Sequence, residues 1–222
     1  MFRITAIVPM RHQSERVPGK NVRPLAGRPL YHYILETLLA VREIGQVVVD
    51  TDSPVILDEL PRRFPSVTAL ERPEHLRAGE IPMNDVLLNT TSRLDADWFV
   101  QTHSTNPLLK PETVSAAIRA LLAGPDHDSL FTVTRLQTRL WNENGTPLNH
   151  DPAVLLRTQD LPPVFEENSC LYIFRRETLV RLGNRLGDRP LMFPIPREES
   201  VDIDEEFDFR MAEYLISRRE KN

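Results

Sequence analysis

Short runs of apolar and β-branched residues alternate along this chain with segments in which apolar residues recur every three or four positions. The short runs are typical of buried strands and occupy residues 3–10, 46–50, 67–70, 98–102, 130–134 and 168–174, with extended pieces at 191–194 and 201–203. The helical spacing predicts helices at residues 29–41, 54–63, 83–94, 111–123, 177–182 and 205–221. The alternation predicts an α/β domain with a doubly wound, mostly parallel sheet, whose ligands bind beyond the carboxyl ends of the strands.

Several helices carry signals of where they begin and which face they bury. Pro29 suits a first helical position, and Ser53 is a typical N-cap. In the last helix, the spacing of Phe207, Met211 and Leu215 predicts that these three side chains face the core.

The alternation breaks at residues 135–164, where no clean crossover segment occurs. This stretch contains Trp141, several prolines and the pair Asn144 and Gly145, which is a hairpin signal. We therefore expect residues 135–164 to leave the core of an otherwise single domain that spans residues 1–222.

Composition narrows the class of partner. The 222 residues, 41% of them hydrophobic, suffice for one core, and the net charge of −5 argues against a nucleic-acid or membrane-surface partner. No apolar run approaches the roughly 20 residues that span a bilayer, and residues 1–11 lack a secretory signal, so we expect a soluble, cytoplasmic protein. Cys170, the one cysteine, is followed by Leu171 and Tyr172 and is expected to be a core residue.

Positive charge gathers just after the first strand, although the protein is acidic. Residues 11–28 hold a single acid, Glu15, and five cations, which are Arg11, Arg16, Lys20, Arg23 and Arg28. The loop contains neither a Walker phosphate motif nor GxGxxG, so its side chains rather than a glycine-rich backbone would bind an anion. A nucleotide triphosphate fits such a cluster; the alternative is a solvated basic loop.

Two acids stand near the start of the last predicted helix. In an extended segment Asp202 and Asp204 project from the same face, because strand side chains alternate, and paired carboxylates suit a hard cation such as Mg²⁺. The alternative is that Asp204 caps the helix, with Glu205 and Glu206 complementing its dipole. The sequence leaves both open.

Polar residues also end the second and fourth strands. Asp50 and Asp52 follow the run "VVV", and Gln101 ends "WFVQ". If the sheet is parallel, these side chains face the same crevice as the basic loop. Asp52 is equally suited to a turn or capping role.

Five ordered segments together resemble the acylneuraminate cytidylyltransferases, enzymes that activate sialic acids and related 2-keto sugar acids with CTP. The first-strand motif of that family is matched at Pro9, Arg11, Ser14, Pro18, Lys20, Asn21, Pro24, Leu25, Gly27, Pro29 and Leu30. The other four segments are "VDTDS", "VQTHSTNPLL", "RTQDLPPVFEENSCLYIF" and "SVDIDEEFDF". Glu15 replaces a motif lysine, and "SERVPGK" resembles the related 3-deoxy-manno-octulosonate cytidylyltransferases.

The resemblance implies a Rossmann-like α/β fold of the nucleotide-diphospho-sugar transferase type. It also implies that residues 135–164 form a dimerisation arm reaching toward the active site of a partner in a homodimer. The implied reaction transfers CMP from CTP to the anomeric hydroxyl of a sialic-acid-like 2-keto sugar acid, with Mg²⁺ required. The alternatives are another sugar nucleotidyltransferase of this fold, acting for instance on 3-deoxy-manno-octulosonate, and a non-catalytic nucleotide-binding module.

The resemblance also implies residue roles. The triphosphate would be held by Arg11, Arg16 and Lys20, and the cytosine would be read by Asn21 and the backbone of Met10 and Arg11, with Asp52 as a further nucleotide-binding candidate. The candidates for contact with the sugar acid are Gln101, Tyr172 and Arg157, the last of which could pair with the carboxylate from the arm. The catalytic set is Arg11, Lys20, Asp202 and Asp204, of which Asp202 and Asp204 would hold the cation.

Overall fold

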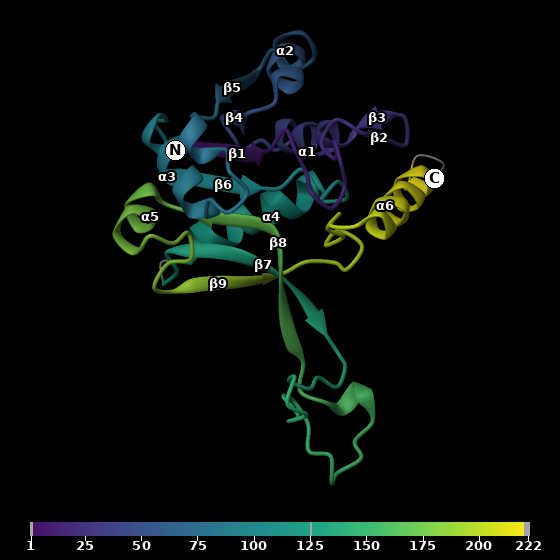
Figure 1. The fold of residues 1–222 in the computed structure, drawn as a ribbon. Coiled ribbons are helices and arrows are strands. Elements are labelled where there is room, and N and C mark those ends of the chain that lie inside the picture. The colour runs from purple at the N-terminus through teal and green to yellow at the C-terminus, as the bar shows by residue number, and fades with distance from the viewer. Residues whose placement is uncertain (1, 125, 220–222) are drawn as a thin grey trace.

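A seven-stranded sheet forms the centre of the protein, as a computed structural model describing residues 2–124 and 126–219 shows (Figure 1). Its strand order is β5-β4-β1-β6-β8-β7-β9. The strands are β1 (Ile4–Met10), β4 (Gln46–Thr51), β5 (Val67–Glu71), β6 (Trp98–Thr102), β7 (Ser129–Leu136), β8 (Val164–Phe174) and β9 (Pro190–Pro194). A separate antiparallel pair joins β2 (Pro24–Leu25) to β3 (Arg28–Pro29).

The sheet is parallel except at β8, which runs antiparallel to both of its neighbours, β6 and β7. The mostly parallel sheet predicted from the alternation of strands and helices is therefore confirmed. Residues 201–203, expected as an extended piece, are not a strand of this sheet.

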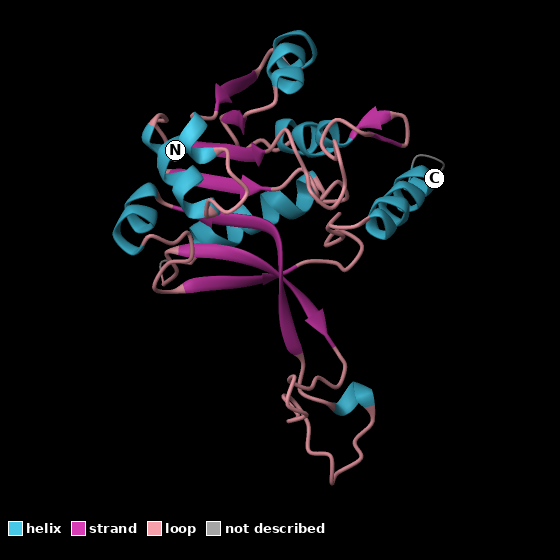
Figure 2. Cartoon of the chain, viewed as in Figure 1, coloured by secondary structure: helices cyan, strands magenta, loops and turns pink. Residues whose placement is uncertain are grey.

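Helices cover both faces of the sheet, as predicted (Figure 2). They are α1 (Leu30–Leu39), α2 (Pro54–Arg63), α3 (Met83–Ser92), α4 (Pro111–Ala123), α5 (Arg176–Leu182) and α6 (Glu206–Arg219), with short 3₁₀ turns η1 (Glu74–Leu76) and η2 (Thr158–Asp160). Along β1, Ala6 and Val8 pack with α1 and α4, whereas Ile7 packs on the opposite face with α3 and α5. No described helix is long and apolar enough to cross a membrane.

The buried face of α6 differs from the predicted one. Phe207 and Met211 are exposed, and the helix instead buries Phe209, Ala212 and Ile216, with Leu215 packed beside them. The reason is that α6 lies against a small apolar cluster around β2 and α1 instead of the main sheet. The guanidinium of Arg23 lies 4.0 Å from the ring of Phe209 and fixes this face. Residues 220–221 of the predicted helix fall outside the described residues.

Strands β7 and β8 continue past the sheet as a long ribbon that ends in an extended loop (Figure 1). The pairing shifts register between Phe131 and Val133, and Ser169 on β8 has a φ of 57°, so the ribbon bends there. The Asn168 side chain stabilises the bend by bonding Thr132 and Thr134. The hairpin predicted near the tip is present, and Gly145 adopts a φ of 80° in it.

Asp50 does not face the crevice, contrary to the sequence-based expectation. It is fully buried and accepts from the guanidinium of Arg72 at 2.6 Å and from the hydroxyl of Thr90 at 2.6 Å. Arg72 is itself 1% exposed and also donates to the Asp50 carbonyl. This buried pair ties the segment after β5 to the end of β4.

Replacing Asp50 by Asn should destabilise the fold by about 3 to 5 kcal/mol, because the buried Arg72 charge would lose its counter-ion. Asp58→Asn is the matched control, since it breaks an exposed ion pair with Arg62 and should cost less than about 0.5 kcal/mol. Urea unfolding followed by circular dichroism measures both. Equal stabilities for the two variants would contradict the role assigned to the buried pair.

Candidate functional site

A cavity of about 410 Å³ opens beyond the carboxyl ends of β1, β4 and β6. Four segments line it: the end of β1 with the basic loop, Asp52 after β4, the stretch with Arg77, Gly79 and Met83, and residues 103–105 after β6. The parallel strands bring these segments together, because their carboxyl ends meet at one edge of the sheet. The predicted nucleotide-binding residues Met10, Arg11, Arg16, Lys20, Asn21 and Asp52 all line this cavity.

Asn21 joins two walls of the cavity. Its amide nitrogen donates to the carbonyl of Arg11 at 2.8 Å, and its oxygen accepts from the hydroxyl of Ser104 at 2.6 Å. The side chain is buried. Asn21 therefore fixes the backbone of Met10 and Arg11, which lines the cavity beside it.

Asp52 holds the same part of the loop, one residue further along the chain. Its carboxylate accepts from the backbone N–H of His12 at 2.7 Å, and the His12 ring lies 3.0 Å from the hydroxyl of Ser53. Ser53 also caps α2, as predicted, by accepting from the N–H of Ile56. Ser53 rather than Asp52 is thus the cap of α2, and Asp52 lies on the cavity wall, where it holds the loop after β1.

The five cations of the basic loop divide into two groups. Arg11, Arg16 and Lys20 line the cavity. Arg23 forms a bidentate pair with Glu206 on α6, and Arg28 pairs with Glu36 on α1. The first group is therefore available to a ligand, while the second holds helices in place.

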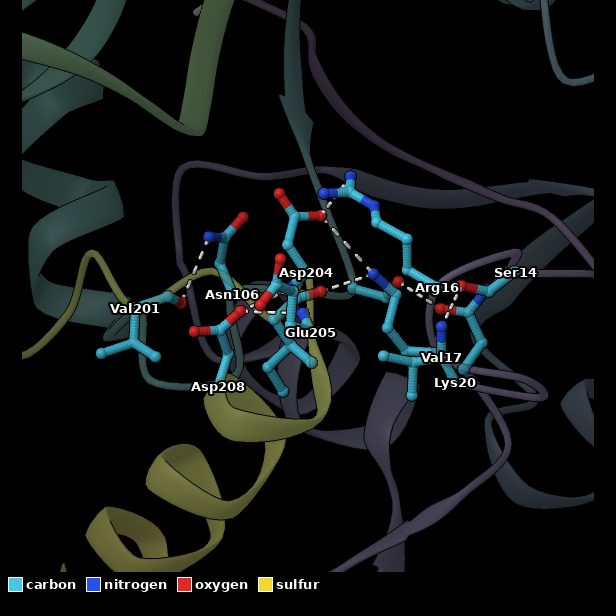
Figure 3. Close-up of polar contacts among 12 residues, drawn as sticks. Ser14, Arg16, Val17, Lys20, Asn106, Val201, Asp204, Glu205 and Asp208 are labelled. Atoms are coloured by element: carbon cyan, nitrogen blue, oxygen red, sulfur yellow. Dashed lines mark hydrogen bonds and ion pairs between the residues drawn. The ribbon is translucent and has the colours of Figure 1, made fainter.

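Two of the cavity cations, Arg16 and Lys20, contact Asp204, one of the two predicted cation-binding acids (Figure 3). Arg16 donates to Asp204 at 2.9 Å, and the Lys20 ammonium lies 3.9 Å from the same carboxylate and donates to the Ile203 carbonyl. Burial lowers the pKa of Lys20, although the charges of Asp204 and Asp202 oppose this shift. Residues from opposite ends of the chain thus form one charged cluster.

Asp202 and Asp204 lie on the same side of their segment, as the alternation predicts. Ile203 between them is fully buried in the cluster beneath α6, and each carboxylate lies within the electrostatic field of the other. Burial raises the pKa of Asp202, a hydrogen bond with Thr105 opposes this, and the charge of Asp204 reinforces it. One buried carboxylate oxygen of Asp202, Oδ1, has no hydrogen-bond partner among the described residues, which fits a cation ligand.

The N-terminus of α6 is capped by a different acid from Asp204, which was the candidate in the sequence analysis. The carboxylate of Asp208 accepts from the backbone N–H groups of Asp204 at 3.0 Å and of Glu205 at 2.8 Å, just before α6 (Figure 3). The carboxylate of Asp204 is instead directed to Arg16 and Lys20. The geometry therefore favours the cation-site interpretation of Asp204.

The three residues expected at the sugar acid are not all brought together. Gln101 on β6 and Tyr172 on β8 are direct cross-strand neighbours, and Gln101 bonds the ring of His103 on the cavity wall at 2.9 Å. Arg157 lies on the extended loop beyond β7 and β8, where it forms a bidentate pair with Asp160. Within one copy of the chain, the loop beyond β7 and β8 that carries Arg157 extends away from the sheet (Figure 1).

The sequence analysis missed one wall of the cavity. Arg77 and Gly79 come from the segment between residues 70 and 83, in which we predicted neither a strand nor a helix. A Cβ atom at Gly79 would lie 3.2 Å from the carboxylate of Glu15, so the close approach of the two loops favours glycine. The available signal was the run "LRAGEIP", which combines an arginine and a glycine between two helical segments.

Comparison with known proteins agrees with this geometry. The sequence profile of the family described as Cytidylyltransferase matches residues 5–210. The chain belongs to the cytidylyltransferase family. The family resemblance drawn from the motifs is thereby confirmed, and the chain is expected to be a CTP-dependent nucleotidyltransferase.

Two relatives carry more specific names. The chain is 26% identical to "N-acylneuraminate cytidylyltransferase A" of Danio rerio, over 97% of this chain and 51% of the relative. It is 27% identical to "CMP-N,N'-diacetyllegionaminic acid synthase" of Legionella pneumophila, over 97% of both chains. The chain therefore spans about half the length of the fish cytidylyltransferase that it matches.

A solved cytidylyltransferase structure confirms the fold class. A CMP:2-keto-3-deoxy-manno-octonic acid synthetase complexed with CTP superposes with a TM-score of 0.69 at 16% identity, over 98% of this chain and 99% of that one. The α/β architecture with a mostly parallel sheet is thus shared with a cytidylyltransferase. At this level of identity the likeness concerns the fold alone.

The pH dependence of stability should report on His103. Burial, with the nearby charges of Arg185 and Lys20, lowers its pKa to about 4 from an ordinary value near 6.5. Between these values the unfolded ring binds a proton that the folded ring does not, so acidification from pH 7 to 4 should destabilise the fold, by about 3 kcal/mol at most from this residue.

Urea unfolding of the wild type and His103→Asn at several pH values measures this contribution. The variant should show a shallower loss of stability below pH 6.5, while the contribution of His32, whose pKa burial also lowers, is common to both proteins. Parallel curves for the two proteins would show that His103 titrates normally.

Proposed function

We propose that the protein transfers CMP from CTP to the anomeric hydroxyl of a sialic-acid-like 2-keto sugar acid and releases pyrophosphate. The observation that supports this most directly is that Arg16 and Lys20, which line the cavity of this cytidylyltransferase-family chain, contact the carboxylate of Asp204. Such an arrangement joins cations for a triphosphate with acids for a metal ion. The named relatives supply the class of sugar acid.

The proposed nucleotide site uses the cavity described above. Arg11, Arg16 and Lys20 bind the triphosphate, while Asn21 and Asp52 hold the loop that presents the Met10 and Arg11 backbone to the cytosine. The hydroxyl oxygen attacks the α-phosphorus, and the bond to the oxygen bridging the α- and β-phosphates breaks. The three cations stabilise the charge that passes to pyrophosphate.

A magnesium ion belongs to the same proposal. Asp202 and Asp204 would hold it, because Mg²⁺ is typically bound by one or two carboxylates together with substrate phosphates. When bound, the ion would neutralise phosphate charge at the reacting phosphorus. Asp202 is also our candidate for accepting the hydroxyl proton.

The sugar acid is proposed to bind on the side of the cavity where Gln101 and Tyr172 lie next to each other. Arg157 would join them from the arm of a second copy, since its own arm extends away from the sheet. The proposal thus treats residues 1–222 as one catalytic domain and residues 135–164 as its dimerisation arm. The expected location is the cytoplasm.

Exposed apolar side chains on the arm support a dimer. They are Trp141, Leu148, Val154, Leu155 and Leu156, and Leu155 is 91% exposed. Large apolar residues gathered on one projecting segment favour burial against a partner. A second copy is the partner that would also deliver Arg157.

Pyrophosphate release with CTP and Mg²⁺ tests the reaction. The panel should contain N-acetylneuraminate, legionaminate- and pseudaminate-type acids, and 3-deoxy-manno-octulosonate. Release with a nine-carbon acid supports the proposal, and release with 3-deoxy-manno-octulosonate alone supports the alternative suggested by "SERVPGK". CTP binding with no release across the panel would favour the non-catalytic module.

Asp204 and Asp208 provide a matched pair of variants. Asp204→Asn should lower pyrophosphate release by at least about 100-fold, because a cation ligand is lost, with little change in melting temperature. Asp208→Asn should remove the cap of α6, cost about 1 kcal/mol of stability and retain most turnover. An active but unstable Asp204→Asn protein would assign the capping role to Asp204.

Leu155→Glu tests the arm. A charge at this exposed apolar position should oppose burial against a partner, so sedimentation should shift from dimer to monomer. CTP binding should persist, because the nucleotide residues lie within one copy, whereas turnover should fall. A wild-type protein that sediments as a monomer would contradict the proposed arm, and Asp151→Asn is the matched exposed control on the same loop.

A further inference from the structure

Arg185, in the loop between α5 and β9, is held in a fixed position beside the two residues proposed for the sugar acid. Its guanidinium lies 3.5 Å from the centre of the Tyr172 ring, and one of its N–H groups donates to Gln101 at 2.6 Å. The face of the guanidinium is thus covered by an aromatic ring, and one edge is fixed by an amide. The guanidinium N–H groups that do not bond Gln101 are therefore held in one orientation.

This guanidinium has no acidic partner. Among residues 2–124 and 126–219, no carboxylate lies within 4.0 Å of Arg185, although the side chain is partly buried. The nearby Glu167 accepts from the hydroxyl of Tyr172 instead. A cation partly removed from water without a counter-ion is costly, and an anionic ligand would compensate for that cost.

Gln101 connects Arg185 to the nucleotide cavity. Because its oxygen accepts from Arg185, its amide nitrogen faces the His103 ring and donates to Nε2 at 2.9 Å. His103 lies on the cavity wall, within the electrostatic field of both Arg185 and Lys20. Arg185 and Lys20, one of the proposed triphosphate cations, therefore both lie near the same histidine.

We propose that Arg185 binds the carboxylate of the sugar acid from within the same copy of the chain. Tyr172 supports the guanidinium, and Gln101 sets its direction. This inference rests on the proposed function and extends it, since it assigns to the core of one copy a contact that the motifs suggested for Arg157 of the arm. Arg157 would then contact another part of the acid or stabilise the dimer.

The test combines a change in the protein with a change in the substrate. N-acetylneuraminate and its methyl ester are compared in pyrophosphate release by the wild type, Arg185→Met and Arg157→Met, with Arg189→Met as the control from the same loop. The wild type should prefer the acid over the ester by about 10- to 100-fold in kcat/KM, as expected for one charge-assisted bidentate contact. Arg185→Met should reduce this ratio to about 1 to 3 by raising the KM for the acid, with CTP affinity unchanged.

Arg185→Lys should give an intermediate ratio, because the charge remains but the fork is lost. Loss of the ratio in Arg157→Met but not in Arg185→Met would overturn the inference. So would a loss of CTP affinity in Arg185→Met with an unchanged ratio, which would show a structural role. Melting temperatures confirm that each variant is folded.

Failure of the proposed function can be told apart from failure of this inference. If the wild type releases no pyrophosphate with any acid, the carboxylate contact is measured as binding, by saturation-transfer NMR of N-acetylneuraminate with the protein and CTP. A transfer signal that Arg185→Met loses and Arg189→Met keeps supports the inference. No signal in the wild type, or equal signals in all three proteins, overturns it.

Discussion

The contact of Arg16 and Lys20 with Asp204 joins residues that are more than 180 positions apart in the chain. It brings the segment before α6 against the basic loop, and Ile203 between the two acids anchors that segment in the core. Without this contact the acids would not be held beside the cations that line the cavity. A triphosphate would compete with Asp204 for the cations, and a divalent cation would compete with the cations for Asp204. Binding of the two ligands is therefore expected to be cooperative.

The single reversed strand of the sheet, β8, serves both halves of the proposed site. At one end it places Tyr172 directly opposite Gln101, next to the cavity. At the other end it leaves the sheet with β7 as the ribbon that carries the arm. The bend at Asn168 and Ser169 lies between the part of β8 that carries Tyr172 and the part that forms the ribbon. It changes the direction of the strand where the core ends.

Local patterns in the sequence predicted most of the fold. Strand and helix positions depend on residues within a few places of each other, and these were predicted well from β1 to α5. The prediction of which face α6 buries was wrong, because that face includes Phe209, which contacts Arg23, more than 180 residues away in the chain. Asp50 was placed in the crevice for a similar reason, since its partner Arg72 lies on another segment. Arg77 and Arg185 lie in loops without periodicity, and no local pattern distinguishes them from surface arginines.

The buried pair of Asp50 and Arg72 has a consequence for how the cavity receives a nucleotide. Arg72 begins the segment whose later residues, Arg77 and Gly79, form one cavity wall, and Arg77 donates back to the Arg72 carbonyl. Displacing the base of this wall would separate an ion pair in the interior, so that part of the wall shares the stability of the core. The nucleotide therefore binds to a preformed surface, and ordering of the protein opposes its binding only slightly.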